Sequence, residues 1–298
     1  MPTVPATSDA EAPLLSGNHA IWFCIVDRTC LITGAAGTLG TWILRTRPGG
    51  TPVVAASHSR SISGVPSARA DLRDRTAVER VLEQIRPSVV IHAAYAKDHR
   101  SIVGATRNVA ECAESVGATL LFISTDAVFA GDGEPRAEDS EPDPVSDYGR
   151  WKLEAERCVM SASPTNAVVR LPLIISLQPA DSGTARIRES AVGEDSTVWF
   201  RDEFRQPARA EELAEAIWDI AALQAHERAG IWHLPGPERL SRFDIAVRVA
   251  EALGLPPGRV SPGDTPAELQ RPRDLLFTGA RAERILGWSP ASIPGATL

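Results

Sequence analysis

The stretch CLITGAAGTLGTWIL, residues 30–44, decides the fold of this chain. It begins with an apolar run, continues through three glycines spaced three apart, and ends with apolar residues at helical spacing. These patterns predict a buried strand at 29–34 and a helix that starts near the third glycine. At such a turn Gly34 allows a sharp bend, Gly37 lets backbone amides approach a phosphate, and Gly40 lets the helix lie close to the sheet.

The helix that follows the glycines has free amides and partial positive charge at its N-terminus. The spacing therefore predicts that the turn binds the pyrophosphate of a dinucleotide, with Thr38 and Leu39 between the last two glycines also in contact. A glycine-rich turn without a ligand is the alternative. The alternation of segments further along the chain favours the dinucleotide.

Apolar strand-like segments and amphipathic helix-like segments alternate after this turn. The predicted strands are 52–57, 88–94, 119–125 and 166–175, and the predicted helices are 75–86, 106–116 and 148–160. Strands without polar alternation, separated by helices, indicate an α/β fold with a parallel sheet covered on both faces. Two further amphipathic helices in the last third, at 209–225 and 242–255, predict a smaller lobe that returns partly to the sheet.

Composition excludes several classes of protein. The chain has 298 residues, of which 43% are hydrophobic and 23% charged, and a net charge of −7. The negative charge argues against nucleic acid, which requires a basic face, and no apolar run approaches the ~18 residues of a membrane-spanning helix. The four cysteines, Cys24, Cys30, Cys112 and Cys158, lack the spacing of a metal site. We expect a cytoplasmic protein with free thiols, no metal, and a small-molecule substrate.

The end of the second predicted strand bears on which nicotinamide cofactor binds. An NAD site usually has an acidic residue there, which accepts hydrogen bonds from the ribose hydroxyls. This chain has His58, Ser59 and Arg60 instead. Because Ser59 and Arg60 could hold a 2′-phosphate, the sequence favours NADP(H) over NAD(H). The alternative is that Arg60 is a solvated surface residue.

Tyr148 and Lys152 stand four residues apart in the segment YGRWK, which on a helix places both on one face. A tyrosine with its usual pKa near ~10 is a poor acid at neutral pH, and we expect the neighbouring ammonium to lower that pKa. The phenol can then protonate a carbonyl oxygen. Thr125, at the end of a buried strand, can hydrogen-bond the same oxygen, whereas Ser124 is predicted to face the sheet. An exposed helical pair is the alternative.

Together these motifs resemble the extended short-chain dehydrogenase/reductase superfamily, whose turn reads T-G-x-x-G-x-x-G as it does from Thr33 here. The segment STDAVFAGDGEPRAEDSEPDPVSDYGRWK, residues 124–152, resembles the dTDP-4-dehydrorhamnose reductase group of sugar-nucleotide enzymes, although Ala130 stands where that group often has aspartate. The resemblance spans about residues 29–290. It implies a Rossmann-type doubly wound parallel sheet with a smaller C-terminal substrate-binding lobe.

The resemblance also implies domain limits and residue roles. The limits are a flexible N-terminal tail at 1–27, an NAD(P)-binding Rossmann domain at 28–177 with 208–233 returning to it, and a substrate-binding lobe at 178–207 and 234–298. Asp71 and Leu72 would border the adenine, Ala93, Ala94 and Tyr95 would pass under the middle of the cofactor, and Lys152 would hold the nicotinamide ribose.

On the substrate side the resemblance leaves alternatives open. Asp126 would contact the substrate or cap its turn, and Arg271 would lie near a substrate phosphate or in a surface ion pair. The family's helix asparagine is missing, with Ile102 near its place, so proton resupply to Tyr148 would need another route. Helices beside the tyrosine form dimer contacts in this superfamily, which implies a homodimer with Trp151 at its interface or in the core.

Three functions fit these residues. The first is NADPH-dependent reduction of a keto group on a nucleotide-activated deoxysugar, with Tyr148 as general acid. The second is reduction of another small-molecule ketone in a biosynthetic pathway. The third is a non-catalytic NADP-binding regulatory subunit that docks on an enzyme partner. The presence of Thr125, Tyr148 and Lys152 together argues against the third.

Overall fold

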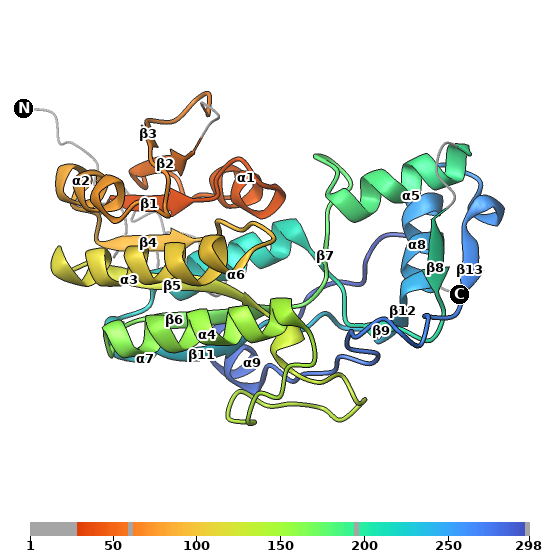
Figure 1. Ribbon diagram of the computed structural model, residues 1–298. Coiled ribbons are helices and arrows are strands. Elements are labelled where there is room, and N and C mark those ends of the chain that lie inside the picture. Colours follow the sequence, from red (N-terminus) through yellow and green to blue (C-terminus); the bar gives the residue numbers. More distant parts are fainter. Residues whose placement is uncertain (1–28, 59–61, 194–196, 296–298) are drawn as a thin grey trace, which may run out of the picture.

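The computed structural model describes residues 29–58, 62–193 and 197–295 (Figure 1). The predicted tail at 1–27 lies outside these residues, as do the cofactor candidates Ser59 and Arg60. Within the described part of the chain, no helix combines the length and apolar character needed to cross a bilayer.

A sheet of seven parallel strands forms the centre of the larger lobe, in the order β3–β2–β1–β4–β5–β6–β11. The strands are β1 (Cys30–Thr33), β2 (Val53–Ser57), β3 (Ser67–Arg69), β4 (Val89–His92), β5 (Thr119–Thr125), β6 (Ala167–Leu171) and β11 (Gly230–His233). This confirms the predicted parallel α/β sheet. The strand order reverses between β1 and β4, so a ligand crevice is expected at the carboxyl ends of these two strands.

Helices cover both faces of the sheet, as Figure 1 shows. One face packs against α1 (Thr38–Arg45), α6 (Ala210–Ala222) and α9 (Ala280–Leu286), and the other against α2 (Arg75–Ile85), α3 (Ala105–Ser115) and α4 (Asp147–Ala162). Neighbouring residues of β1 serve the two cores, Ile32 on the α1 side and Leu31 on the α2 side. Because both faces are buried, the strands read as continuous apolar runs.

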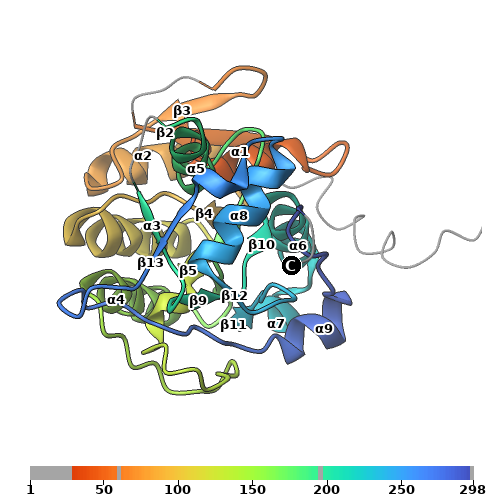
Figure 2. The same ribbon diagram turned by 90° about the vertical axis from the view of Figure 1, so that its right-hand side faces the viewer.

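The smaller lobe, shown toward the viewer in Figure 2, is built on two helices and three short two-stranded ladders. Its elements are α5 (Ser182–Val192), α8 (Arg242–Ala252), β7 (Ile174–Ile175) with β10 (Ala208–Arg209), β9 (Phe204–Arg205) with β12 (Leu240–Ser241), and β8 (Val198–Phe200) with β13 (Ser261–Gly263). The sequence pattern did not predict α5, because this helix buries Thr184 and Ser190 beside its apolar residues and its periodicity is weak.

Short elements complete the chain between these helices and strands. They are the π-helix η2 (Arg100–Gly104), the 3₁₀-helices η3 (Asp126–Val128) and η4 (Pro257–Arg259), and the one-turn helix α7 (Ala225–Arg228). The acidic loop after β5 pairs with a late segment through bridges from Asp132 to Asp274 and from Arg136 to Phe277. The C-terminal part of the chain therefore returns to the loop that follows β5. The predicted domain limits stay a prediction.

Candidate active site

The glycine turn between β1 and α1 has a shape that side chains would destroy. Gly34 has φ +69°, and a Cβ on it would lie 2.5 Å from the backbone of Ala93. A Cβ on Gly40 would collide with the carbonyl oxygen of Gly34 and lie 2.6 Å from the Cα of Ala35. Gly37 precedes α1, and no side chain among the described residues caps this helix. The first amides of α1 are therefore available to an anionic ligand.

Two adjoining cavities extend from this turn, with volumes of about 480 Å³ and about 340 Å³. Both are lined by Gly34, Gly37 and Tyr95, so they lie on either side of the same residues at the carboxyl ends of β1 and β4. The larger cavity is also lined by the predicted adenine-side residues Asp71 and Leu72 and by Ala94, which was predicted under the middle of the cofactor. The smaller cavity is also lined by Thr38, Leu39, Gly40, Ala93, Thr125, Tyr148 and Lys152. The structure thus brings together every described residue that we predicted for the cofactor.

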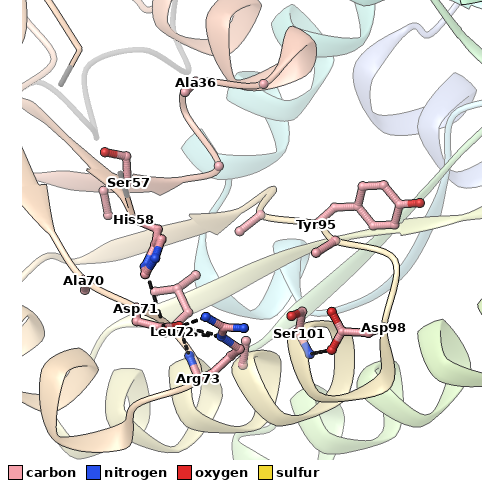
Figure 3. Close-up of a pocket in the computed structure, with 16 residues that line it drawn as sticks. Ala36, Ser57, His58, Ala70, Asp71, Leu72, Arg73, Tyr95, Asp98 and Ser101 are labelled. Atoms are coloured by element: carbon pink, nitrogen blue, oxygen red, sulfur yellow. Dashed lines mark hydrogen bonds and ion pairs between the residues drawn. The ribbon is translucent and has the colours of Figure 1, made fainter. Parts of the chain in front are cut away.

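Charged side chains gather at the far end of the larger cavity (Figure 3). Arg73 donates two hydrogen bonds to Asp71, from Nε at 2.9 Å and from Nη2 at 2.8 Å, and His58 Nδ1 lies 3.9 Å from the same carboxylate. The hydrogen bonds from Arg73 hold the pKa of Asp71 below its usual range. Arg73 was not predicted from the sequence; its signal was its position two residues after the predicted adenine-side aspartate.

The catalytic candidates meet in the smaller cavity. Thr125 ends β5, and Tyr148 and Lys152 lie one turn apart on α4, facing the same space as the glycine turn. Lys152 Nζ donates to the carbonyl oxygen of Ile123 at 2.8 Å. Burial lowers the pKa of Lys152 to about 8, opposed by the charge of Glu156.

The expectation that Lys152 lowers the pKa of Tyr148 is wrong for this structure. Burial of the phenol is the largest effect and raises the pKa of Tyr148, with smaller contributions in the same direction from Tyr95 and Asp126; only the Thr125 side chain opposes them. The ammonium of Lys152 is directed to a backbone carbonyl instead. Tyr148 therefore keeps its proton at neutral pH, which is the state that a proton donor requires.

Gly149 places the tyrosine beside the threonine. A Cβ on this glycine would collide with the carbonyl oxygen of Ala127 and lie 2.9 Å from the Cβ of Pro144. Only a glycine lets α4 pack this closely against the turn after β5, where Thr125 lies. Gly149 was not predicted to have a role, although it stands within the Y-G-x-x-K segment.

The structure also shows the contacts of the remaining candidate residues near β5. Ser124 was predicted to face the sheet; its hydroxyl donates to Glu156 on α4, and the residue also lines the smaller cavity. Thr125, and not Asp126, caps η3, by accepting from the Ala127 amide at 3.2 Å. Asp126 is 6% exposed, and its Oδ2 has no hydrogen-bond partner among the described residues. Burial raises the pKa of Asp126 to about 6.

The structure also defines the surroundings of Ile102 and Arg271. Ile102 is buried within η2, so an apolar side chain occupies this position in the helix. Arg271 forms an ion pair, but its partner is the fully buried Glu203 and not a surface carboxylate; Nη2 lies 2.8 Å from Oε1. The Arg271 side chain is still 40% exposed.

The amino-acid sequence was compared with known protein families. Residues 28–293 match the RmlD substrate binding domain. The chain belongs to this family. This RmlD-family chain is 32% identical to the dTDP-4-dehydrorhamnose reductase of Mycobacterium tuberculosis over 270 residues. The aligned region covers 85% of this chain and 84% of that protein. The predicted family resemblance is thereby confirmed.

Two other similarities were found. The RmlD-family chain is 28% identical over 291 residues to the methionine adenosyltransferase 2 subunit beta of Danio rerio, covering 90% of this chain and 87% of that subunit. Its fold is similar to the crystal structure of the dTDP-4-dehydrorhamnose reductase of Bacillus anthracis in complex with NADP, with a TM-score of 0.74 and 22% identity over 90% of this chain and 94% of that one.

Proposed function

We propose that this RmlD-family chain uses NADPH to reduce a keto group on a nucleotide-activated deoxysugar. The observation that carries the proposal is the cavity of about 340 Å³ in which the glycine turn, Thr125, Tyr148 and Lys152 face one another. The name of the 32% identical relative, dTDP-4-dehydrorhamnose reductase, supports the same reaction and the same substrate class.

The residues present fit a dinucleotide. The turn is a cradle that a Cβ at Gly34 or Gly40 would fill, and the amides of α1 would hold the pyrophosphate. Asp71 and Leu72 would border the adenine. Arg73, at the far end of the cavity, would add positive charge for a 2′-phosphate to that of Arg60, and the Ser59 hydroxyl could donate a hydrogen bond to it, which favours NADP(H) over NAD(H). When bound, the dinucleotide supplies the hydride that reduces the carbonyl carbon.

The protein's own residues would handle the proton. Tyr148, which retains its proton because burial raises its pKa, would donate it to the carbonyl oxygen as negative charge develops there. The Thr125 hydroxyl would donate a hydrogen bond to the same oxygen and orient the carbonyl. Lys152 would bind the nicotinamide ribose. Ile102 has no polar side-chain atom, so proton resupply would not pass through that side chain.

A substrate panel tests this proposal. The chain should oxidise NADPH when a dTDP-4-keto-6-deoxy sugar is added, and the loss of NADPH absorbance measures the rate. Turnover of a small ketone and of no nucleotide sugar would support the second function instead. NADPH binding without turnover of any keto sugar would contradict the substrate class proposed here.

A regulatory role is the second candidate, because the chain matches a methionine adenosyltransferase subunit along nearly its whole length. In that case the chain should form a stable complex with a methionine adenosyltransferase and alter its kinetics. Size-exclusion chromatography of the mixture measures the complex. A Tyr148→Phe variant with unchanged effect on the partner would favour this role over catalysis.

Gly40→Ala is expected to abolish NADPH binding and to lower the melting temperature. Alanine is ordinarily the better helix former by ~1 kcal/mol, but here its Cβ would collide with the Gly34 carbonyl, and such overpacking costs ~1–3 kcal/mol. Fluorescence titration with NADPH and thermal denaturation measure the two effects. Gly49→Ala is the matched control, because no atom lies within 4 Å of the added Cβ. Native NADPH affinity in Gly40→Ala would refute the role of the turn.

The affinity for NADPH is expected to fall as the pH rises through about 8, where Lys152 loses its charge. An unfolded lysine has a pKa of ~10.4. Between pH 8 and this value Lys152 is protonated in the unfolded chain but neutral in the folded one, so the free energy of unfolding rises with pH in this window. Titrations across this window measure the affinity, and Lys152→Met should bind weakly at every pH. If the affinity of the unmodified protein for NADPH did not change across this pH window, the proposed role of the Lys152 charge in cofactor binding would be contradicted.

A further inference from the structure

Asp126 is a buried carboxyl group that the proposed reaction leaves unused. It begins η3 directly after Thr125, and the residue is 6% exposed. Its Oδ2 has no hydrogen-bond partner among the described residues. Burial disfavours the ionised form, so the pKa of Asp126 is raised to about 6. Unlike an exposed aspartate, this group therefore gains and loses a proton close to neutral pH.

A chain of hydrogen bonds connects Asp126 with the proposed proton donor. The Thr125 hydroxyl lies 3.2 Å from Asp126 Oδ1, and it also forms a hydrogen bond with Tyr148. Thr125 Oγ1 accepts from the Ala127 amide at 3.2 Å, so one lone pair and the single hydroxyl proton remain for the other two neighbours. Thr125 therefore accepts a hydrogen bond from one of these neighbours while it donates to the other.

The protonation state of Asp126 sets the direction of this chain. An ionised Asp126 only accepts, so Thr125 donates to it and Tyr148 donates to Thr125. A protonated Asp126 donates to Thr125, whose own proton then points toward the phenol and the reacting carbonyl. The charge acts in the same direction: ionised Asp126 raises the pKa of Tyr148, so its neutralisation makes the phenol a better acid. The protonated form is thus the one arranged for reduction.

Charged and titratable groups from two other elements act near Asp126. Arg205 on β9 lowers the pKa of Asp126, but this arginine also pairs with the fully buried Glu203, at 2.7 Å. On α4, Tyr148 has a raised pKa and Lys152 one of about 8. Arg205, Tyr148 and Lys152 therefore all stay protonated near pH 6. A change in proton transfer at that pH reports the titration of Asp126.

We propose that Asp126 stores the proton that restores Tyr148 after each reduction and that Thr125 passes it on, an assignment that rests on the proposed function. The carbonyl carbon takes the hydride and the carbonyl oxygen takes the Tyr148 proton, which leaves a phenolate. Thr125 gives its proton to the phenolate and takes the proton of Asp126. The resulting carboxylate takes a proton from water between turnovers, so each ketone consumes one hydride and one solvent proton. Asp126 acts only through Thr125, and this route does not need a polar side chain at Ile102.

The pH dependence of kcat in both directions tests the assignment on the unmodified chain. Cofactor and substrate are kept saturating, so that weaker NADPH binding near pH 8 has no effect. We expect kcat for reduction to fall as the pH rises through about 6, by up to ~10-fold per pH unit, because the carboxylate holds no proton to supply. Oxidation of the product alcohol by NADP should accelerate over the same range, because the reverse reaction needs an empty carboxylate. If kcat did not change near pH 6 in either direction, the assignment would be overturned.

Asp126→Asn keeps the size of the side chain and removes its titration. This variant should lose both pH dependences and reduce the keto sugar ~10–100-fold more slowly at pH 6, while NADPH affinity is retained. In a Thr125→Val background, adding Asp126→Asn should change kcat by less than about 2-fold, because the chain is already broken. Asp147→Asn is the matched control: this exposed carboxylate precedes Tyr148 and pairs with Arg150 at 2.6 Å, and its pH profile should be native.

The remaining outcomes separate this assignment from its alternatives. If Asp126 acted only through its charge, Asp126→Asn would raise kcat for reduction above pH 6, and that result would overturn the relay. If Asp126→Asn does not fold, Thr125→Val decides, because a relay through Thr125 predicts that its profile lacks the change near pH 6. If a small ketone but no keto sugar is reduced with the expected profiles, the relay stands and the deoxysugar proposal fails. If no ketone is reduced at any pH, both proposals fail.

Discussion

Replacing Tyr148 with phenylalanine is expected to reduce kcat by ~10²–10⁴-fold while NADPH binding is retained. The change removes the hydroxyl that would donate the proton and keeps the ring, which packs edge-on against Tyr95 with centroids 5.6 Å apart. The cofactor contacts would come from the glycine turn and Lys152, so they should be unaffected. Steady-state kinetics with a keto sugar and fluorescence titration with NADPH measure the two quantities.

Tyr95→Phe is the matched control for this experiment. Tyr95 is 54% exposed, lines the same cavity and is one of the predicted cofactor residues, so this change removes a hydroxyl beside the cofactor while the proposed proton donor, Tyr148, stays in place. We expect its kcat to stay within a few-fold of the native value. A Tyr148→Phe variant with native kcat would eliminate the tyrosine as general acid and would leave the fold and the cofactor cavity as the supported features.

Glu156→Gln is expected to destabilise the protein by ~3–5 kcal/mol, because it breaks a buried ion pair and leaves Arg170 charged in the core. Arg170 donates to Glu156 Oε2 from Nη2 at 2.8 Å and to Oε1 from Nε at 3.1 Å. Both side chains are 4% exposed. Ser124 donates to the same carboxylate, and Arg170 Nη1 lies 3.3 Å from His233 Nε2. Denaturant unfolding measures the change in free energy.

Glu154→Gln provides the comparison on the same helix. Glu154 forms an exposed pair with His99 at 2.9 Å, and such pairs contribute less than ~1 kcal/mol. Equal losses of unfolding free energy in the two variants would show that the buried ion pair stabilises the protein no more than the exposed one. Because the charge of Glu156 raises the pKa of Lys152, Glu156→Gln should also move the fall in NADPH affinity to lower pH.

Features that depend on nearby residues could be predicted from the sequence. The strand, turn and helix around Gly34, Gly37 and Gly40 follow from apolar spacing and from steric limits within a dozen residues. The four-residue separation of Tyr148 and Lys152 is enough to place them on one helix face. The doubly wound sheet follows in the same way, because strands buried on both faces lack polar alternation.

Other features were decided only when distant segments packed together. The pKa of Tyr148 is set by burial and by neighbours from the loop after β4, from the end of β5 and from η3, so the expectation from Lys152 alone was wrong. The partner of Arg271 is Glu203, 68 residues earlier, and Arg170 pairs with Glu156 across two elements. Local spacing determines which residues share a helix or a strand. Desolvation and ion pairing depend on which groups the tertiary fold places around each charge, and a sequence pattern does not contain that information.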